Sequence, residues 1–313
     1  MPTLRRLEYL IAISEHRNFH RAAKAAHVSQ PTLSQQLRLL EDELGVVLID
    51  RSLAGGELTP IGRDIYERAR RIIGQVDDLK RAALVAQTGG EVGILRVGVS
   101  PTLGPYLLPE IVAELYSDMP GLKIHIREGI PDEQVGELTN GAIDLLLAPL
   151  PLRSAEMHTE LLFEEPLRIV ASVGHPLTKR RLLETADLAN HGVLNLDSRH
   201  HLSRQLTIMC DALKMQLLQN YEGTSLDSLY QMAASGLGLA ILPELYLKSS
   251  AGAVGGVRVL KVRGYEMSRQ IALLWRKDAP YQDTCLQVAK RIRMRGSKLL
   301  RGRLSGVSAR EAD

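Results

Sequence analysis

The sequence lacks any apolar run close to the length of about 18 residues that a membrane-spanning helix needs. Its first residues, MPTLRRLEYLIAISEHRNF, meet polar groups too early for a secretory signal peptide. With 45% hydrophobic and 24% charged residues over 313 positions, the composition is that of a globular chain with room for a small domain and a larger one. These features predict a cytosolic, cytoplasmic protein with no membrane partner.

Cysteine and net charge are also scarce. The chain has only two cysteines, Cys210 and Cys285, and they lie far apart in the sequence. Such a pair defines no disulfide framework, as expected of a protein kept in a reducing compartment, and a redox role stays open. The net charge of +3 is too small to indicate a polyanionic partner by itself. Any interaction with nucleic acid must therefore be inferred from local patterning.

Motifs for catalysis and metal binding are missing as well. The α/β region has no GxSxG elbow, no Walker loop and no GxGxxG after its first predicted strand. No CxxC or HxxxH spacing supports a metal site at His200, His201 and Cys210. We therefore predict no enzymatic activity, no cofactor and no metal. An enzyme with an accessory DNA-binding domain is a remote alternative.

What the sequence does contain begins with the periodicity of three helices in the first 45 residues. Asn18 is a good N-cap for the second helix and Ser29 for the third, where Pro31 is tolerated in the first turn. The connection around His27 and Val28 is only a few residues long. This spacing predicts a helix-turn-helix.

The third of these helices has a polar face without acidic residues. Leu33, Leu37 and Leu40 recur at helical spacing on the opposite side. Glutamine pairs with adenine and arginine with guanine in the major groove, and serine and threonine contact bases or phosphates, so this face suits base edges. An ordinary polar surface helix is the alternative. The polar face comprises Gln30, Thr32, Ser34, Gln35 and Arg38.

Two further features follow the three helices. The segment VVLIDRSLAGGELTP, residues 46–60, predicts a short hairpin around residues 54–56, a wing beside the helices. A long helix from Pro60 to about Gln87 has apolar residues at steps of three and four. One apolar stripe on so long a helix predicts pairing with a second copy of the chain. The segment TGGEVG, residues 88–93, marks a boundary.

From residue 94 onward, predicted strands alternate with helices, as in α/β proteins with largely parallel sheets. The first strand ends at Ser100 and a helix follows, so the hydroxyls of Ser100 and Thr102 and the free backbone N–H groups there predict an anion pocket. Thr224 and Asp227 have approximate capping-box spacing at another helix start. Two capped helices without a ligand are the alternative. The predicted strands are residues 94–100, 122–129, 143–150, 167–173, 192–197, 238–243 and 270–276.

The segment LEYLIAISEHRNFHRAAKAAHVSQPTLSQQLRLLEDELGVVLIDRS, followed by LTPIG, resembles the winged helix-turn-helix of LysR-type transcriptional regulators nearly position by position. The resemblance continues through LRVGVSPTLGPYLLP and TSLDSLYQMAASGLGLAILP, and so covers almost the whole chain. The OxyR branch is the nearest match within the family. The resemblance implies a DNA-binding transcriptional regulator that responds to a small-molecule effector.

The implied fold is an N-terminal all-α winged helix-turn-helix with a long linker helix, followed by a two-lobed α/β effector-binding domain similar to periplasmic binding proteins. Lobe I comprises residues of about 90–165 and 265–304, and lobe II residues of about 166–264. The implied domain boundaries are 1–60 for the DNA-binding domain, 61–89 for the dimerising linker helix, 90–304 for the effector domain and 305–313 for a tail.

The resemblance also implies the sites and the partners. The partners are double-stranded promoter DNA, a small-molecule effector that the predicted pocket suggests is anionic, RNA polymerase, and further copies of the chain in a homodimer or homotetramer. The DNA-binding positions are Gln30, Pro31, Thr32, Ser34, Gln35 and Arg38, with Arg51 in the wing contacting the DNA backbone. The effector-binding positions are Ser100, Pro101, Thr102, His201, Asn220, Thr224 and Ser225.

One departure separates this sequence from the OxyR branch, which senses peroxide through a cysteine thiolate that then pairs with a second cysteine. His201 occupies the peroxidatic position and Cys210 the resolving position. An imidazole forms neither a sulfenic acid nor a disulfide, so that switch cannot operate here. Asn220 stands where the branch has a histidine, whereas Thr102, which helps to position peroxide there, is retained. A different thiol switch that uses Cys210 is the alternative to a small-molecule effector.

Overall fold

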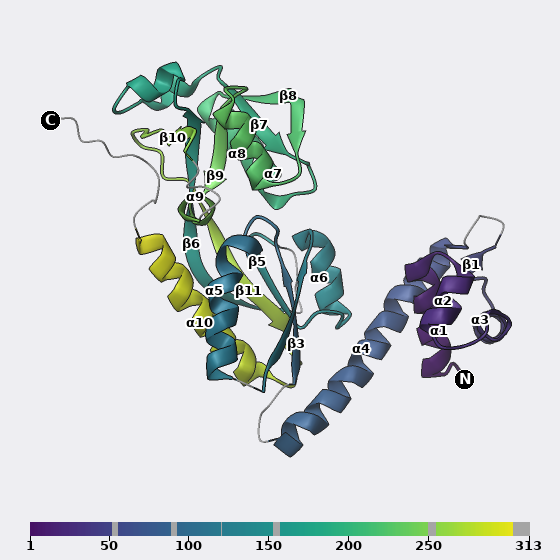
Figure 1. Ribbon diagram of the computed structural model, residues 1–313. Helices are drawn as coiled ribbons and strands as arrows, with labels where there is room; N and C mark the ends of the chain where they lie inside the picture. Colours follow the sequence, from purple (N-terminus) through teal and green to yellow (C-terminus); the bar gives the residue numbers. More distant parts are fainter. Residues whose placement is uncertain (52–55, 89–92, 120, 153–156, 250–254, 303–313) are drawn as a thin grey trace. The chain divides into compact units, whose positions relative to one another are not determined.

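The computed structural model describes residues 1–51, 56–88, 93–119, 121–152, 157–249 and 255–302. The chain divides into two compact units, which are residues 1–91 with 136–143, and residues 92–135 with 144–313. Figure 1 shows the helices of the first unit and the mixed sheets and helices of the second. The predicted hairpin turn at 54–56, the boundary at 88–93 and the tail at 305–313 lie largely or wholly outside the described residues.

The first unit begins with the three predicted helices, α1 (Leu4–His16), α2 (Phe19–Ala25) and α3 (Gln30–Leu44). Both predicted caps are confirmed: the side chains of Asn18 and Ser29 each accept a hydrogen bond from the backbone N–H three residues later. The three helices bury one continuous apolar core, because their leucines and alanines recur at helical spacing on the facing sides.

The wing and the long helix are present as predicted. Strand β1 (Ile49–Asp50) pairs antiparallel with β2 (Glu57–Leu58), and α4 runs from Pro60 to Thr88. One end of the apolar stripe of α4 is covered within the unit, where Ala69 is buried in the core of the three helices. Leu79, further along the stripe, is 71% exposed, so much of the stripe has no cover among the residues that the structure describes.

The second unit is built on a seven-stranded sheet with the order β10-β6-β11-β5-β3-β4, in which β9 pairs with one end of β6. A smaller sheet contains the parallel pair β7-β8. The strands are β3 (Ile94–Val99), β4 (Lys123–Glu128), β5 (Leu145–Pro149), β6 (Met157–Ser172), β7 (Gly192–Leu196), β8 (Gln216–Gly223), β9 (Ala240–Pro243), β10 (Val257–Val259) and β11 (Ser268–Arg276).

Strand β6 is shared by the two lobes of this unit (Figure 1). It pairs with β11 as far as Pro166, and with β9 and β10 from Leu167 to Ser172. The prediction of a largely parallel sheet was wrong, because β6 and β11 run alongside each other in opposite directions and all pairs of β6 are antiparallel. Only β3 pairs in parallel in the large sheet, with β4 and β5.

All seven predicted strands are present, and three segments were not predicted. The first half of β6 and the whole of β8 are rich in polar residues with partly exposed side chains, so neither contains a continuous apolar run. Strand β10 has only three residues, fewer than the length that patterning detects. Pairing with neighbouring strands, rather than the local sequence, therefore determines that these three segments form strands.

The helices of the second unit cover the sheets. Among the described residues, every helix of the chain is too short or too polar to span a lipid bilayer. The helices are α5 (Gly104–Asp118), α6 (Pro131–Thr139, which crosses into the residues assigned to the first unit), α7 (His201–Leu213), α8 (Leu226–Ala234), α9 (Glu244–Lys248) and α10 (Gln282–Arg301), with short 3-10 helices at Pro176–Lys179 and Thr185–Leu188.

One predicted cap is displaced by a residue. The N-cap of α8 is Ser225, whose hydroxyl accepts from the backbone N–H of Ser228 at 3.1 Å, and the Ser228 side chain completes the capping box. The predicted pair of Thr224 and Asp227 was therefore wrong. The serine at 225 has the same cap chemistry as the neighbouring threonine and lies at the position from which the helix starts.

Candidate functional site

The first candidate site is the polar face of α3. Gln30, Thr32, Gln35 and Arg38 are exposed there, and Ser34 is half-buried. The opposite face is anchored by Leu33, Leu37 and Leu40, which are fully buried. The predicted residue Pro31 is also exposed, in the first turn. The base-contacting positions predicted from the sequence therefore share one accessible face on a rigid helix.

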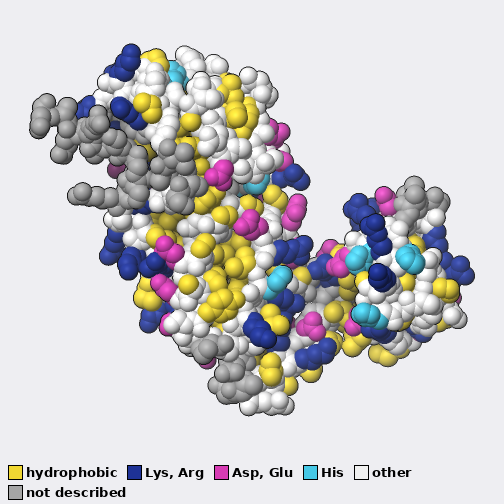
Figure 2. Space-filling view, in the orientation of Figure 1, with side chains coloured by type: hydrophobic (Ala, Val, Ile, Leu, Met, Phe, Trp, Pro, Cys, Tyr) yellow, Lys and Arg dark blue, Asp and Glu magenta, His cyan; other side chains and the backbone are white. Residues whose placement is uncertain are grey.

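The charges at this face are suited to a polyanion. Gln35 and Arg38 make no hydrogen bond or ion pair with any residue that the structure describes, so their polar groups are available to a partner. The N-cap at Ser29 holds the start of the helix, and its hydroxyl also lies 2.7 Å from the hydroxyl of Thr32. Figure 2 shows Lys, Arg and His side chains over the visible face of the first unit.

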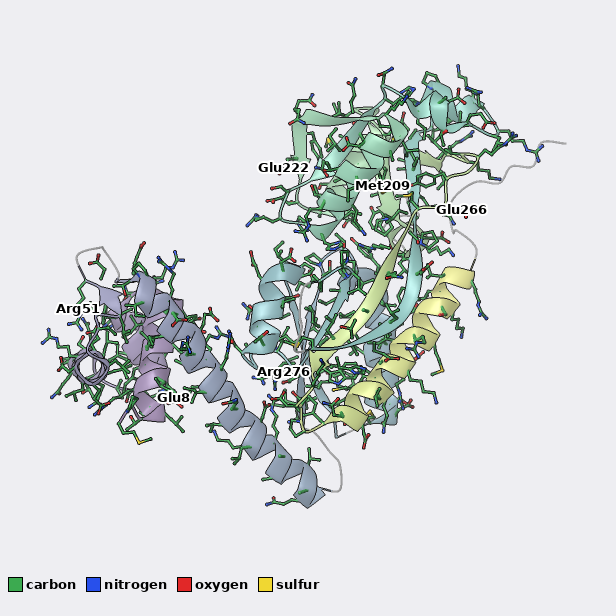
Figure 3. The ribbon with its side chains drawn as sticks, turned by 180° about the vertical axis from the view of Figure 1, so that it is seen from behind. Glu8, Arg51, Met209, Glu222, Glu266 and Arg276 are labelled. Atoms are coloured by element: carbon green, nitrogen blue, oxygen red, sulfur yellow. The ribbon has the colours of Figure 1, made fainter. Side chains whose placement is uncertain are left out.

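Arg51, the predicted wing contact, follows β1 (Figure 3). Its guanidinium donates to Glu41 at 3.0 Å, and the other oxygen of this carboxylate accepts from the backbone N–H groups of Leu48 and Ile49. Arg38 and Arg51 line the same surface groove of about 460 Å³. Glu41 thus orients Arg51 beside α3, and a phosphate group can compete for this exposed cation because surface ion pairs are weak.

The second candidate site is a pocket of about 480 Å³ between the two lobes of the second unit. Four predicted effector-binding residues line it, two at the start of α5 and two at the start of α8. They are Pro101, Thr102, Thr224 and Ser225. The topology brings these segments together although more than a hundred residues separate them in the sequence.

Other predicted effector positions lie elsewhere. Asn220 is exposed on β8 and does not line this pocket. His201 begins α7 and is only 5% exposed; its Nε2 lies 3.2 Å from the carbonyl oxygen of Pro151. Burial lowers the pKa of His201, so its ring is neutral near pH 7. Ser100 is buried and does not line the pocket, and its hydroxyl lies 3.1 Å from that of Thr102.

The sequence predicted an anion pocket formed by free hydroxyl and backbone N–H groups at Ser100 and Thr102. This prediction was wrong, because several of these groups already have hydrogen-bond partners. The Thr102 hydroxyl accepts from Nη1 of Arg269 at 2.8 Å, and the Thr102 carbonyl accepts from Nη2 at 2.9 Å. The backbone N–H of Ser100 donates to the carbonyl of Leu147. The Thr102 hydroxyl and carbonyl oxygens and the Ser100 N–H are therefore already engaged within the fold, so the loop does not present the set of free groups that the prediction assumed.

Arg269 joins this loop to the strand shared by the lobes. Its guanidinium donates to Oε2 of Glu165 from Nε at 2.9 Å and from Nη2 at 2.8 Å, and both side chains are fully buried. The other oxygen of Glu165 accepts from the backbone N–H of Leu245 at the start of α9. Burial raises the pKa of the Glu165 carboxyl, and the charge of Arg269 opposes this effect.

The pocket lining also includes Tyr106, Glu128, His200 and Asp227, which were not among the predicted effector-binding residues, although Asp227 was noted at the same helix start as Thr224. The hydroxyl of Tyr106 donates to Oδ2 of Asp227 at 3.3 Å, and the hydroxyl of Tyr246 donates to Oδ1 at 3.4 Å. Burial and the charge of Asp227 raise the pKa of both tyrosines, which therefore stay neutral donors. The position of Glu128 near the end of a predicted strand was a usable signal, since ligands bind at strand ends in α/β proteins.

Both cysteines are buried free thiols. Cys210 lies on α7 in the core of lobe II, where burial raises its pKa to about 11, and burial raises the pKa of Cys285 to about 12. Thiolate is the reactive form of cysteine, so neither thiol has the electropositive, accessible surroundings of a redox-sensing cysteine.

A winged helix-turn-helix with an exposed basic and polar helix, together with a two-lobed domain with a pocket between its lobes, defines a ligand-responsive DNA-binding regulator. Two family models match the chain: the bacterial regulatory helix-turn-helix of the lysR family over residues 4–63, and the LysR substrate-binding domain over residues 88–293. The chain belongs to the LysR family of bacterial regulators. It is therefore a transcriptional regulator with a DNA-binding domain and an effector-binding domain.

The curated and structural relatives include OxyR proteins. The DNA-binding transcriptional dual regulator OxyR of Escherichia coli K12 is 36% identical over 293 residues, which cover 93% of this chain and 95% of that protein. A full-length OxyR variant from Pseudomonas aeruginosa has a TM-score of 0.77 and 30% identity, with coverage of 96% of this chain and 97% of that one. A hydrogen peroxide-bound OxyR mutant from Corynebacterium glutamicum has a TM-score of 0.65 and 28% identity, with coverage of 96% and 94%. The predicted family, fold class and OxyR resemblance are thus confirmed.

Proposed function

We propose that the exposed face of α3 recognises the operator sequence in promoter DNA, with Arg51 on the DNA backbone. The observation that carries this proposal is the unpaired polar face of Gln30, Gln35 and Arg38 on a helix whose opposite side is fully buried. Residues 1–60 form the DNA-binding domain in this proposal, 61–89 the linker helix, 90–304 the effector domain and 305–313 a tail. Because promoters lie in the bacterial cytoplasm, the proposal places the protein there.

The response to the effector completes the proposal. A small molecule bound between the lobes favours one arrangement of the lobes, and this changes the spacing of the DNA-binding domains and their contact with RNA polymerase. The exposed apolar residues Ile61, Ile72 and Leu79 of α4 support a homodimer, and two dimers form a homotetramer on neighbouring half-sites. No catalytic step is included, in line with the relatives, which are transcriptional regulators.

Gln35→Ala is expected to weaken operator binding by about 1–3 kcal/mol, or roughly 5- to 150-fold, because a bidentate contact to a base edge is lost. Binding to random duplexes is expected to change little, since that affinity comes from phosphate contacts. Both affinities are measured by fluorescence anisotropy at one salt concentration, on an operator selected from a random library by the wild-type protein. Gln75→Ala, an exposed glutamine on α4, is the matched control. An equal loss on both kinds of DNA refutes the base-contacting role.

A footprinting experiment tests the alternative function, a thiol switch at Cys210. At pH 8 a thiol with a pKa of about 11 is ionised in about one molecule in a thousand, so peroxide is expected to leave Cys210 reduced. We therefore expect the same operator footprint from reduced protein, peroxide-treated protein and the Cys210→Ser variant. A footprint that shifts with peroxide in the wild type but not in the variant would establish a thiol switch in place of the small-molecule response.

A further inference from the structure

The chemistry of the interlobe pocket indicates which class of molecule it binds. Two acidic side chains line it, Glu128 at the end of β4 and Asp227 in the first turn of α8. Among the described residues, neither Lys nor Arg lines the pocket. The partners of Asp227 are the neutral hydroxyls of Tyr106 and Tyr246, and Glu128 forms no ion pair with any described residue. Within the described part of the chain, no cationic side chain of the pocket lining compensates these two carboxylates.

A histidine side chain faces the same space. His200 lines the pocket, is only 9% exposed, and its ring makes no hydrogen bond with the part of the chain that the structure describes. Burial lowers the pKa of His200, so the ring is neutral near pH 7. One of its two nitrogens can then accept a hydrogen bond. The ring is thus free to accept a hydrogen bond from a ligand that enters the pocket.

The remaining lining groups fit the same ligand. Tyr106 supplies an aromatic ring beside the two carboxylates, and aromatic rings attract cations. The hydroxyls of Thr224 and Ser249 are able to accept further N–H groups. The N-terminus of α8 also borders the pocket and favours an anion, but the carboxylate of Asp227 already lies in that first turn. An anionic ligand therefore meets like charge from both Asp227 and Glu128.

We propose that this pocket binds an organic amine, a cation with two or more N–H donors, whose ammonium groups lie beside Glu128 and Asp227 and donate to His200. The inference rests on the proposed function, in which this pocket is the effector site. The pocket volume of about 480 Å³ is in the range of sites for small molecules, which suits an aliphatic diamine or triamine rather than a peptide or a nucleotide chain.

Isothermal titration of the full-length protein tests the proposal with 1,4-diaminobutane and spermidine as amines and hexanedioate as the dicarboxylate of similar length. We expect saturable binding of at least one amine, and no binding of hexanedioate. Glu128→Gln is expected to weaken amine binding at least tenfold, because it removes one charge without changing side-chain size. Asp227→Asn is expected to do the same and retains an oxygen for the tyrosine hydroxyls.

Glu133→Gln is the matched control, since Glu133 is an exposed carboxylate on the nearby α6 that does not line the pocket. Its amine affinity should stay within twofold of the wild type. The proposal is overturned if neither amine binds, if Glu128→Gln binds as tightly as Glu133→Gln, or if hexanedioate binds and Glu128→Gln strengthens that binding. The last result leaves an effector site of anionic class, whereas the proposed function itself fails only if operator binding is absent or indifferent to Gln35.

Discussion

Arg269→Met is expected to lower the free energy of unfolding of the second unit by about 3–5 kcal/mol. The substitution leaves Glu165 buried without its cation and removes both donors to Thr102. An uncompensated charge in the protein interior costs far more than the lost contact alone. Urea unfolding followed by tryptophan fluorescence measures this effect, because the single tryptophan, Trp275, is buried on β11 of the same unit.

Two controls separate the buried charge from the general loss of an arginine. Arg263→Met removes an exposed guanidinium 3.3 Å from Glu184, and its cost should not exceed about 1 kcal/mol. The double variant Arg269→Met/Glu165→Leu leaves neither charge of the pair and should regain much of the stability. If Arg269→Met unfolds at the same urea concentration as Arg263→Met, the buried pair does not contribute as we expect.

Leu37→Ala is expected to destabilise the first unit by about 2–5 kcal/mol, since this side chain is fully buried between the helices and its truncation leaves a cavity. Far-UV circular dichroism and hydrogen exchange of the α3 amides measure the loss, because the first unit contains no tryptophan among its 91 N-terminal residues. Operator binding by the Leu37→Ala variant should fall steeply on warming and recover on cooling, because DNA binding requires the folded first unit.

Leu39→Ala is the matched control on the same helix. Leu39 is 37% exposed, so its truncation should cost no more than about 1 kcal/mol. The comparison with Gln35→Ala is equally informative, since that exposed residue is expected to reduce operator affinity at every temperature without changing stability. If Leu37→Ala and Leu39→Ala are equally stable, α3 does not depend on this core as the structure indicates.

The ligand class inferred for the pocket changes the expectation that the sequence raised. From the sequence, Ser100 and Thr102 after a strand suggested an anion pocket, because hydroxyls and backbone N–H groups at that position commonly bind anions. In the structure the Arg269 guanidinium donates a hydrogen bond to the Thr102 hydroxyl. The carboxylates that line the pocket come from two other segments, at Glu128 and Asp227. The charge of the pocket thus depends on residues far from this loop in the sequence.

Local interactions made the first unit predictable from the sequence. The caps at Asn18 and Ser29 act on backbone groups three residues away, and the apolar spacing of α3 needs no partner to be recognised. The same locality explains the prediction of the strongly apolar strands, such as β5 and β9, which are buried at every position. For these elements the periodicity and the end signals lie within one segment of chain.

The sequence by itself determined the family, the two kinds of domain and the exposed polar face of α3, because each depends on residues close together in the chain. Only the tertiary structure decided that Arg269 pairs with Glu165, 104 residues away, and that Glu128, His200 and Asp227 face one pocket. It also decided the antiparallel pairing of β6 with β11. Such contacts depend on how distant segments pack, and the amino-acid spacing within any one segment carries no information about that packing.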